Sequence, residues 1–381
     1  MSKLKSTKKS IQSVVKKSSK TKAKKVVSKK PTKKKAVVKK PPAKKKATPK
    51  KIASKKKAPP NAAKLAAKSI QPASKRKFRL ITRSDFDGLV CALLLMHLEI
   101  LNDVTFVHPK DMQDGKVKVT DNDISTNLPY AEGIHLAFDH HESETIRVGH
   151  KSNHIIDPRA PSAARVVYDY YGGKSSFPDI SDELMAAVDK ADSAQFTRGD
   201  VANPQGWELL SFLMDARTGL GRFKNFRISN YQLMIDLTLQ SGAYTIEQIL
   251  AMPDVKERVE LYQQYQSAAK KQIQENATVQ GDVIVLDLRR QEMIYPTNRF
   301  TIYDLFPQCN VSIHVMQGKQ NENTVLAIGK SIFKRDSSVN IGDLCLQYGG
   351  GGHQAAGTCQ VSNDKADAVL AELVGKINRK V

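Results

Sequence analysis

The run Phe138-Asp139-His140-His141-Glu142 directly follows an apolar segment that begins at Gly133. Neighbouring side chains on a strand point to opposite faces of a sheet, so an acid and two imidazoles in a row are poor material for a core strand. They suit a place where the backbone has just left the sheet and the side chains turn into a crevice. The run therefore predicts a strand that ends at Phe138 and delivers polar side chains to a site.

Strands and helices alternate on both sides of this run. The pattern predicts strands at 78–82, 104–107, 116–120 and 133–138, and helices at 89–101, 161–171 and from Ser181, as N-cap, to about 190. This alternation is typical of an α/β fold with a parallel sheet. Because the carboxyl ends of parallel strands open onto one crevice, acids that follow these strands should gather there.

The second half of the chain predicts a connector and a smaller domain. One face of 254–276 is apolar, which indicates a helix packed along one side. Beyond it we expect strands at 282–288, 310–316, 324–333 and 358–361, and helices at 341–348 and 364–378. The chain of 381 residues then divides into a catalytic domain at 78–252, a connector helix at 253–278 and a smaller α/β domain with a mixed sheet at 279–381.

The first 77 residues differ sharply in composition from the rest. They hold 30 of the 61 lysines and arginines and no acidic residue, which leaves 31 basic against 38 acidic residues in the remainder. Such a segment cannot bury enough apolar surface to offset chain entropy, so we predict a disordered basic tail at 1–77. Its charge predicts association with DNA, RNA or polyphosphate, with a solubility or targeting role as the alternative.

The sequence shows no apolar run of signal-peptide or membrane-span length, so no membrane partner is expected. The cysteines are scattered without metal-type pairing and fit a reducing compartment: Cys91, Cys309, Cys345 and Cys359. We therefore expect a cytoplasmic protein. Association with the nucleoid and a homodimer are left open.

Several acids share one topological position. Asp85, Asp87, Asp121 and Asp139 each follow an expected strand, and Asp192 follows a helix of the same unit. Alone, each motif has a plainer interpretation as a turn, a helix cap or a surface cluster. Gathered carboxylates raise one another's pKa unless a cation lies between them, and oxygen-rich sites with an imidazole suit Mn²⁺ or Mg²⁺. Together, the motifs predict a two-metal site for phosphoryl transfer.

A glycine run, Gly349 to Gly352, precedes His353. Consecutive glycines can expose backbone N–H groups as an anion-binding nest, and the histidine adds a titratable donor at its rim. The alternative is a flexible loop with an incidental histidine. The small residues at 355–357 argue against it, because they permit close backbone approach to a ligand or a neighbouring element.

These motifs together resemble those of the DHH phosphoesterases that carry a DHH-associated C-terminal domain. The resemblance runs from about Phe78 to near the C-terminus, and its matching stretches are 85–88, 119–122, 138–141, 191–193 and 349–357. It implies a two-domain hydrolase with the active site in the cleft between its domains. The C-terminal domain would bind the substrate.

The resemblance also implies roles for single residues. Two Mn²⁺ ions, or Mg²⁺ as an alternative, would be held by Asp85, Asp87, Asp121, His140 and Asp192, with Asp121 bridging them. His141 would lie near the phosphoryl group, and Asp139 would orient the neighbouring imidazole. Substrate phosphates would be bound by Gly350, Gly351, Gly352 and His353, with Lys330, Lys334 and Arg335 as further candidates.

The sequence departs from the family upstream of Asp85. Many members carry a further His or Asp ligand there, whereas these offsets here hold Ile81 and Arg83. A guanidinium cannot ligate a cation, so either another residue, for which His108 is a candidate, completes the first metal site, or water does. Arg83 would then be free to contact a substrate phosphate directly.

The prediction is a Mn²⁺-dependent hydrolase of phosphoanhydride or phosphodiester bonds. Inorganic polyphosphate is the favoured substrate, because 107–111 and 357–359 are similar to exopolyphosphatase-like members. The alternatives are an exonuclease, an oligoribonuclease-like nanoRNase or a cyclic-dinucleotide phosphodiesterase. A different class of protein is also open: a non-catalytic nucleic-acid-binding protein with a degenerate metal site.

Overall fold

The first sheet is parallel, as predicted. The computed structural model describes residues 76–240 and 244–379. Five strands take the order β2-β1-β3-β4-β5, and every neighbouring pair is parallel. They are β1 (Phe78–Arg83), β2 (Leu101–Val107), β3 (Asp123–Thr126), β4 (Leu136–Asp139) and β5 (His154–Ile156). The interior strand β1 is fully buried at Leu80 and Ile81, as expected of a parallel sheet covered on both faces.

Helices follow the strands and begin at predictable caps. The apolar helix α2 (Phe86–His97) is buried nearly throughout and contacts α5 (Ala163–Tyr170), α6 (Asp182–Asp192) and α9 (Asn230–Gln240). The Asp85 carboxylate caps α2, and Ser181 caps α6 by accepting from the Leu184 N–H at 3.0 Å, as predicted. The remaining helices here are α3 (Pro109–Gln113), α4 (Glu142–Val148), α7 (Arg198–Ala202), α8 (Gly206–Met214) and α10 (Ile246–Leu250).

One predicted strand is wrong. Residues 116–120 alternate in polarity but form no strand, and β3 begins only at Asp123. The Asp123 carboxylate accepts from the Thr120 N–H at 2.6 Å and from Arg79 Nε at 2.7 Å, which holds the point where the chain enters the sheet. Val117 and Val119 pack against an apolar cluster without pairing their backbone in the sheet. Asp121 therefore precedes a strand instead of following one.

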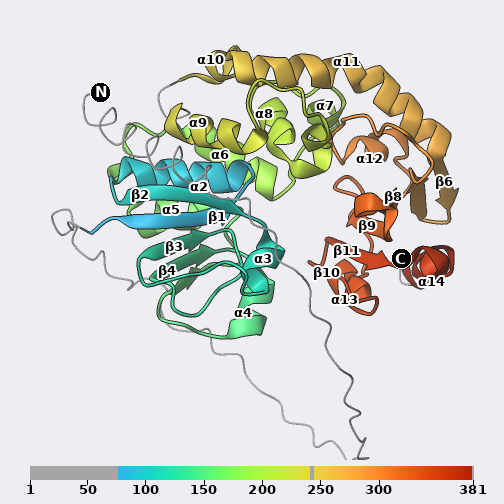
Figure 1. Cartoon of the computed structure of the whole chain (residues 1–381), viewed down its shortest axis with the longest axis horizontal. Coiled ribbons are helices and arrows are strands. Elements are labelled where there is room, and N and C mark those ends of the chain that lie inside the picture. The colour runs from blue at the N-terminus through green and yellow to red at the C-terminus, as the bar shows by residue number, and fades with distance from the viewer. Residues whose placement is uncertain (1–75, 241–243, 380–381) are drawn as a thin grey trace, which may run out of the picture. The chain divides into compact units, whose positions relative to one another are not determined.

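A long helix, α11 (Pro253–Asn276), leads from α10 to a second sheet (Figure 1). This sheet has six strands in the order β10-β11-β9-β8-β7-β6, and it is mixed, as predicted, because β7 and β8 are parallel while the other pairs are antiparallel. Its elements are β6 (Ala277–Gln280), β7 (Val283–Asp287), α12 (Thr301–Leu305), β8 (Val311–Gln317), β9 (Thr324–Lys330), α13 (Ile341–Leu346), β10 (Gly351–Gly352), β11 (Ala356–Val361) and α14 (Ala366–Asn378).

One apolar cluster joins residues from both halves of the chain. Phe196 and Phe212 pack on Phe300, with ring centroids 5.7 and 6.3 Å away. Next to them the buried Asn298 side chain donates to the Val201 carbonyl at 3.0 Å. The loop before α12 is thereby held close to the end of α8, which matters for the site described below. The domain boundaries themselves stay a prediction.

Two other predictions concern the rest of the chain. All four cysteines are free thiols and buried, as expected. Within residues 76–240 and 244–379, no helix is both long and apolar enough to cross a membrane. The predicted disordered tail lies outside the described residues, apart from Arg76 and Lys77.

Candidate active site

Three predicted metal ligands converge. Asp87 lies in the first turn of α2, His140 directly follows β4, and Asp192 ends α6. One ligand atom from each lies within 4.8 Å of the others. His140 Nε2 is 2.8 Å from Asp192 Oδ2, yet it forms no well-aligned hydrogen bond among the described residues. This arrangement, in which the two atoms are close but do not point at each other, is expected where both atoms face an ion that they share.

The far side of two of the three ligands, Asp87 and His140, is held in place. Both oxygens of the buried Asp87 carboxylate accept backbone N–H groups at the start of α5, from Ala163 at 3.0 Å and Ala164 at 2.8 Å. His140 Nδ1 lies 3.1 Å from the Ala160 carbonyl and donates to it, so the other ring nitrogen, Nε2, faces the site. The ligands are thus oriented by the backbone before any ion binds.

The pKa values of the trio indicate that its two carboxylates favour a positive charge between them. Burial raises the pKa of Asp87 well above its usual range, and the nearby Asp192 adds to this rise. Burial alone would lower the pKa of His140, but the carboxylates of Asp192 and Asp87 outweigh it and raise that pKa to about 9. A divalent ion would take the place of the proton held here. Two carboxylates and one imidazole suit Mn²⁺ or Mg²⁺, so the residues fit one such ion.

His141 is held between Asp139 and His353. The fully buried Asp139 accepts from His141 Nδ1 at 2.6 Å and from the His140 N–H at 2.9 Å through the same oxygen, Oδ1. The His141 ring stacks on that of His353, with centroids 4.6 Å apart and planes 24° apart. Burial, with the charge of His141, lowers the pKa of His353 to about 4, so His353 is neutral at pH 7. The two motifs are therefore brought together in space.

The glycine run does not form the expected nest. Gly351 and Gly352 form β10, which pairs with β11, while the Gly350 N–H donates to the Cys345 carbonyl at 3.0 Å and the His353 N–H to Ala356 at 2.7 Å. A Cβ atom at Gly350 or Gly352 would overlap a backbone carbonyl of β11. The glycines permit tight packing of a hairpin that carries His353, and these N–H groups are already used within the protein.

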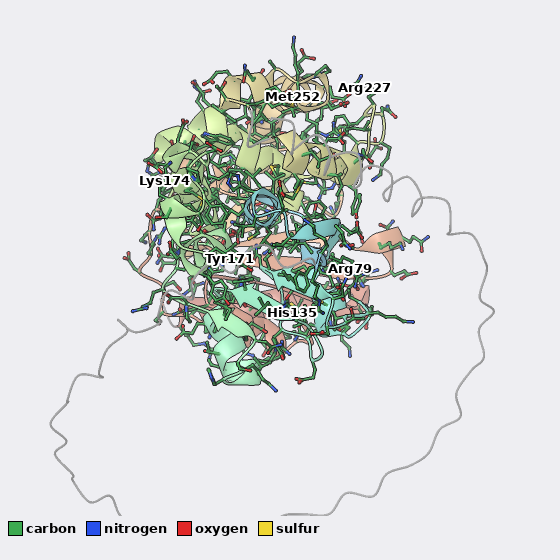
Figure 2. All side chains as sticks on the ribbon, turned by 90° about the vertical axis from the view of Figure 1, so that its left-hand side faces the viewer. Arg79, His135, Tyr171, Lys174, Arg227 and Met252 are labelled. Carbon is green, nitrogen blue, oxygen red and sulfur yellow. The ribbon has the colours of Figure 1, made fainter. Side chains whose placement is uncertain are left out.

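Asp121 lies away from the site, so the prediction that it bridges two metals is wrong. Its exposed carboxylate pairs with Arg76 at 2.6 Å and lies 3.3 Å from His135 Nδ1. These residues stand at the edge where the strands begin, opposite to the edge where His140 follows β4. Figure 2 labels two residues of this edge, Arg79 and His135. The cause is the late start of β3 at Asp123.

Asn127 takes the place at the carboxyl end of β3 that Asp121 was expected to hold. Its backbone is left-handed, with φ of 54°, and its Nδ2 lies 3.3 Å from Asp85 Oδ1. The other oxygen of Asp85 pairs with Arg83 Nε at 2.8 Å. Burial raises the pKa of Asp85, and the Arg83 charge opposes this rise. The sequence analysis missed Asn127, although a polar residue after Asp-Ile-Ser-Thr was a usable signal.

The other predicted residues have partners within the protein. Arg335 Nη2 donates to the Ala194 carbonyl at 3.1 Å, just beyond Asp192, so it lies near the site but is tied to the backbone. Lys330 and Lys334 donate to the carbonyls of Ser337 and Gln308, each at 3.0 Å. His108 caps α3 through Nδ1 and supplies no metal ligand.

Comparison with known proteins decides the family. No family model and no protein with a curated description matches the chain. Among solved structures, the pGpG-specific phosphodiesterase PggH from Vibrio cholerae is 57% identical, with a TM-score of 0.69, over 80% of this chain and 100% of that one. The chain belongs to the DHH family of phosphoesterases. It is therefore a metal-dependent hydrolase of phosphodiester bonds, as the motif order indicated.

Two further structures are more distant from this DHH phosphoesterase. A DHH domain from a member of the s1p family of ribosomal proteins is 12% identical, with a TM-score of 0.49, over 80% of this chain and 87% of that one. RecJ from Thermus thermophilus, in complex with Mn²⁺, is 14% identical, with a TM-score of 0.45, over 80% of this chain and 52% of that one. Neither adds to the assignment.

The DHH phosphoesterase has an open pocket of about 420 Å³ beside the ligand trio. Its wall includes charged residues that the sequence analysis missed: Asp215, Arg217 and Arg299. Asp215 Oδ1 accepts from Arg217 Nε at 2.7 Å, and Arg299 Nε lies 3.5 Å from Asp215 Oδ2. Burial lowers the pKa of Arg299 to about 10, which leaves it charged at pH 7. No local sequence signal separates these residues from ordinary surface charge, because the packing of Phe300 on Phe212 places them.

Proposed function

We propose that this DHH phosphoesterase uses Mn²⁺ to hydrolyse the phosphodiester bond of short 5′-phosphorylated dinucleotides such as pGpG. The observation that carries this proposal is the 57% identity to a pGpG-specific phosphodiesterase over the whole of that chain. The polyphosphate interpretation has weaker support, because it rests on two short stretches. One of them, 107–111, holds the cap of α3, and its His108 contacts no residue of the ligand trio.

The site offers each part that such a reaction needs. A divalent ion held by Asp87, His140 and Asp192 would polarise the attacking water and offset phosphoryl charge. His141, oriented by Asp139, turns its free Nε2 away from that carboxylate, where it can hold or pass a proton. Neutral His353 can donate a hydrogen bond to a phosphate oxygen. In the reaction, water bonds to phosphorus, the bond to the 3′ oxygen breaks, and a proton from water ends on that oxygen.

The basic segment suggests a macromolecular partner in addition to the substrate. Thirty cations without an acidic neighbour at 1–77 favour binding to a polyanion, with strong salt dependence. It has no Phe, Trp or Tyr, which disfavours readout of sequence by stacking. We propose that this segment binds nucleic acid without sequence preference.

A substrate panel tests the proposed function. The full chain with Mn²⁺ is offered pGpG, cyclic di-GMP, a five-nucleotide RNA and polyphosphate, and mononucleotide or phosphate release is followed. We expect pGpG to be turned over with a kcat/KM at least about 100-fold above that for the others, because the relative that is 57% identical is specific for pGpG. Faster release of phosphate from polyphosphate would overturn the proposal.

Variants complete this test. His140→Ala removes a ligand and should lower kcat/KM by about 10³-fold or more, whereas His150→Ala, in an exposed loop, is the matched control. Deletion of residues 1–75 should leave pGpG turnover within about twofold of the full chain while weakening binding to long duplex DNA. A shortened chain that binds DNA equally well would contradict the role proposed for the basic segment.

A further inference from the structure

We infer that this active site binds one divalent ion, and that the guanidinium of Arg83 supplies the second positive charge that a two-metal phosphoesterase takes from a second ion. The inference rests on the proposed phosphodiester hydrolysis but concerns a different property, the number of bound ions. It follows from where the structure places the ligands expected for the second ion.

The second ion lacks its expected ligands. Asp121 lies at the opposite edge of the sheet, paired with Arg76 and His135. In its place Asn127 brings a neutral amide, whose Nδ2 faces Asp85 at 3.3 Å. Asp85 has further partners: Oδ1 accepts from the Gly88 N–H at 3.0 Å, and Oδ2 pairs with Arg83. A lone carboxylate already paired with a cation is a weak ligand set for Mn²⁺.

Arg83 stands where the missing charge is needed. It ends β1, and its Nε lies 2.8 Å from Asp85 Oδ2, with about a third of its side chain exposed. After Asp85, the carboxylates of Asp192, Asp215 and Asp87 are also near enough to raise the pKa of Arg83. The positive charge of Arg83 is also close enough to His353 to help lower the pKa of that imidazole. Arg83 thus lies between the ligand trio and the histidine of the second sheet.

The charges balance with one ion. Asp85, Asp87 and Asp192 contribute three negative charges when ionised, and Arg83 contributes one positive charge. One divalent ion brings this set to neutrality. A second divalent ion would leave a net positive charge of two beside the guanidinium. The pocket wall already carries Arg217 and Arg299, and both of these arginines pair with the same carboxylate, Asp215. Asn127 Oδ1 has no hydrogen-bond partner among the described residues, and a rotated amide that placed Oδ1 in the position of Nδ2 would offer a second ion one more oxygen ligand.

During hydrolysis the guanidinium would act on the reacting phosphate. The water oxygen bonds to phosphorus, the bond to the 3′ oxygen breaks with its electron pair on that oxygen, and a proton from water ends there. Arg83 keeps its own protons and donates hydrogen bonds to the non-bridging oxygens as their charge grows. A planar guanidinium can reach two such oxygens at once, which a second ion would otherwise do.

Ion stoichiometry tests the inference without reference to turnover. The full chain is dialysed against rising Mn²⁺, and bound metal is measured by elemental analysis and electron paramagnetic resonance. We expect one tight ion per chain with the spectrum of an isolated Mn²⁺, and loss of this ion in His140→Ala. Two tight ions per chain with an exchange-coupled spectrum would overturn the inference and show that Asn127 and Asp85 hold the second one.

Arg83 variants test the role of the charge. Arg83→Met should keep the tight Mn²⁺ and lower kcat by about 10²- to 10³-fold with little change in KM, since the interaction forms mainly in the transition state. Arg83→Lys should retain more activity than Arg83→Met, and free guanidinium should partly restore Arg83→Ala. The exposed Arg227, paired with Asp254 and labelled in Figure 2, provides the control Arg227→Met. A kcat of Arg83→Met within about twofold of wild type would refute the inference.

The two failures can be told apart. If the wild type turns over no phosphodiester, the proposed function fails, whatever the ion count. If it turns over pGpG and holds two tight ions, the proposed function stands and the inference alone is lost. Circular dichroism of each Arg83 variant separates lost charge from a lost fold.

Discussion

Asp139 shows how one buried carboxylate organises its neighbours. It is fully buried, and its Oδ1 accepts from both the His140 N–H and His141 Nδ1. A buried charge without partners is costly, so this carboxylate favours the conformation in which both histidines lie at the site. It also fixes a proton of His141 on Nδ1, so that in the proposed reaction Nε2 would face the substrate.

Replacing Asp139 by Asn keeps the shape and removes the charge. We expect Asp139→Asn to lower kcat about 10- to 100-fold, because the amide no longer fixes the ring of His141 or its protonation. Steady-state kinetics with pGpG and a Mn²⁺ titration would measure this, and the bound Mn²⁺ should stay. Asp182→Asn, at an exposed carboxylate that pairs with Lys174, is the control. Equal kcat in both variants would mean that Asp139 has no positioning role.

At the scale of elements, the hairpin β10–β11 and helix α13 form one unit that presents His353. The Gly342 N–H in α13 donates to the His353 carbonyl at 2.8 Å, and the Gly350 N–H donates to Cys345 at 3.0 Å. A Cβ atom at Gly342 would overlap the backbone at Gly352, so the helix and the hairpin touch through their main chains. The position of His353 therefore depends on close packing that only glycine allows.

Two neighbouring glycines give a matched pair of variants. Gly350→Ala would place its Cβ against Thr358 and Cys359, whereas a Cβ at Gly351 meets no atom within 4 Å. We expect Gly350→Ala to lower the free energy of unfolding by about 1–3 kcal/mol, as overpacking does, and to weaken pGpG turnover. Gly351→Ala should stay within about 0.5 kcal/mol of wild type. Urea denaturation measures both, and equal losses would argue against main-chain packing as the cause.

For the whole molecule, a histidine in the second sheet links the free energy of unfolding to pH. His314 lies in the middle of β8, and burial lowers its pKa to about 4. In the unfolded chain a histidine has a pKa of about 6.5. The unfolded state therefore binds more protons between these values. The contribution of neutral His314 is complete above about pH 6.5 and is lost progressively as pH falls toward 4.

This linkage predicts a smaller pH dependence in His314→Gln. One pKa unit corresponds to about 1.4 kcal/mol. Between pH 6.5 and pH 4, the free energy of unfolding should therefore fall by about 1–3 kcal/mol less in the variant than in the wild type. Urea denaturation at several pH values gives the two curves, and their difference should be constant from pH 7 to pH 8. Parallel curves over the acid range would show that His314 is not responsible. The pKa of His353 is also lowered to about 4, so His353 adds the same pH dependence of the free energy of unfolding to the wild type and to the variant.

Much of the fold could be predicted from local patterns in the sequence. Apolar runs, helix caps and glycines are local signals, so they located β1, α2, β4 and α6 and the parallel order of the first sheet. Parallel strands end at one edge, and this rule was enough to predict that Asp87, His140 and Asp192 meet. Alternation of strands and helices predicts that the strands are parallel, although it leaves their order open.

The tertiary structure decided what depends on partners from distant segments. The alternation at 116–120 looked like a strand, but pairing begins at Asp123, and a shift of a few residues moved Asp121 to the far edge and put Asn127 at the site. The pairing of Arg83 with Asp85, and the approach of Arg299 to Asp215, likewise depend on packing between elements. Local patterns indicate which residues are apolar and at what spacing they recur. Strand register and ion pairing depend instead on contacts between distant segments, which form only when the chain folds.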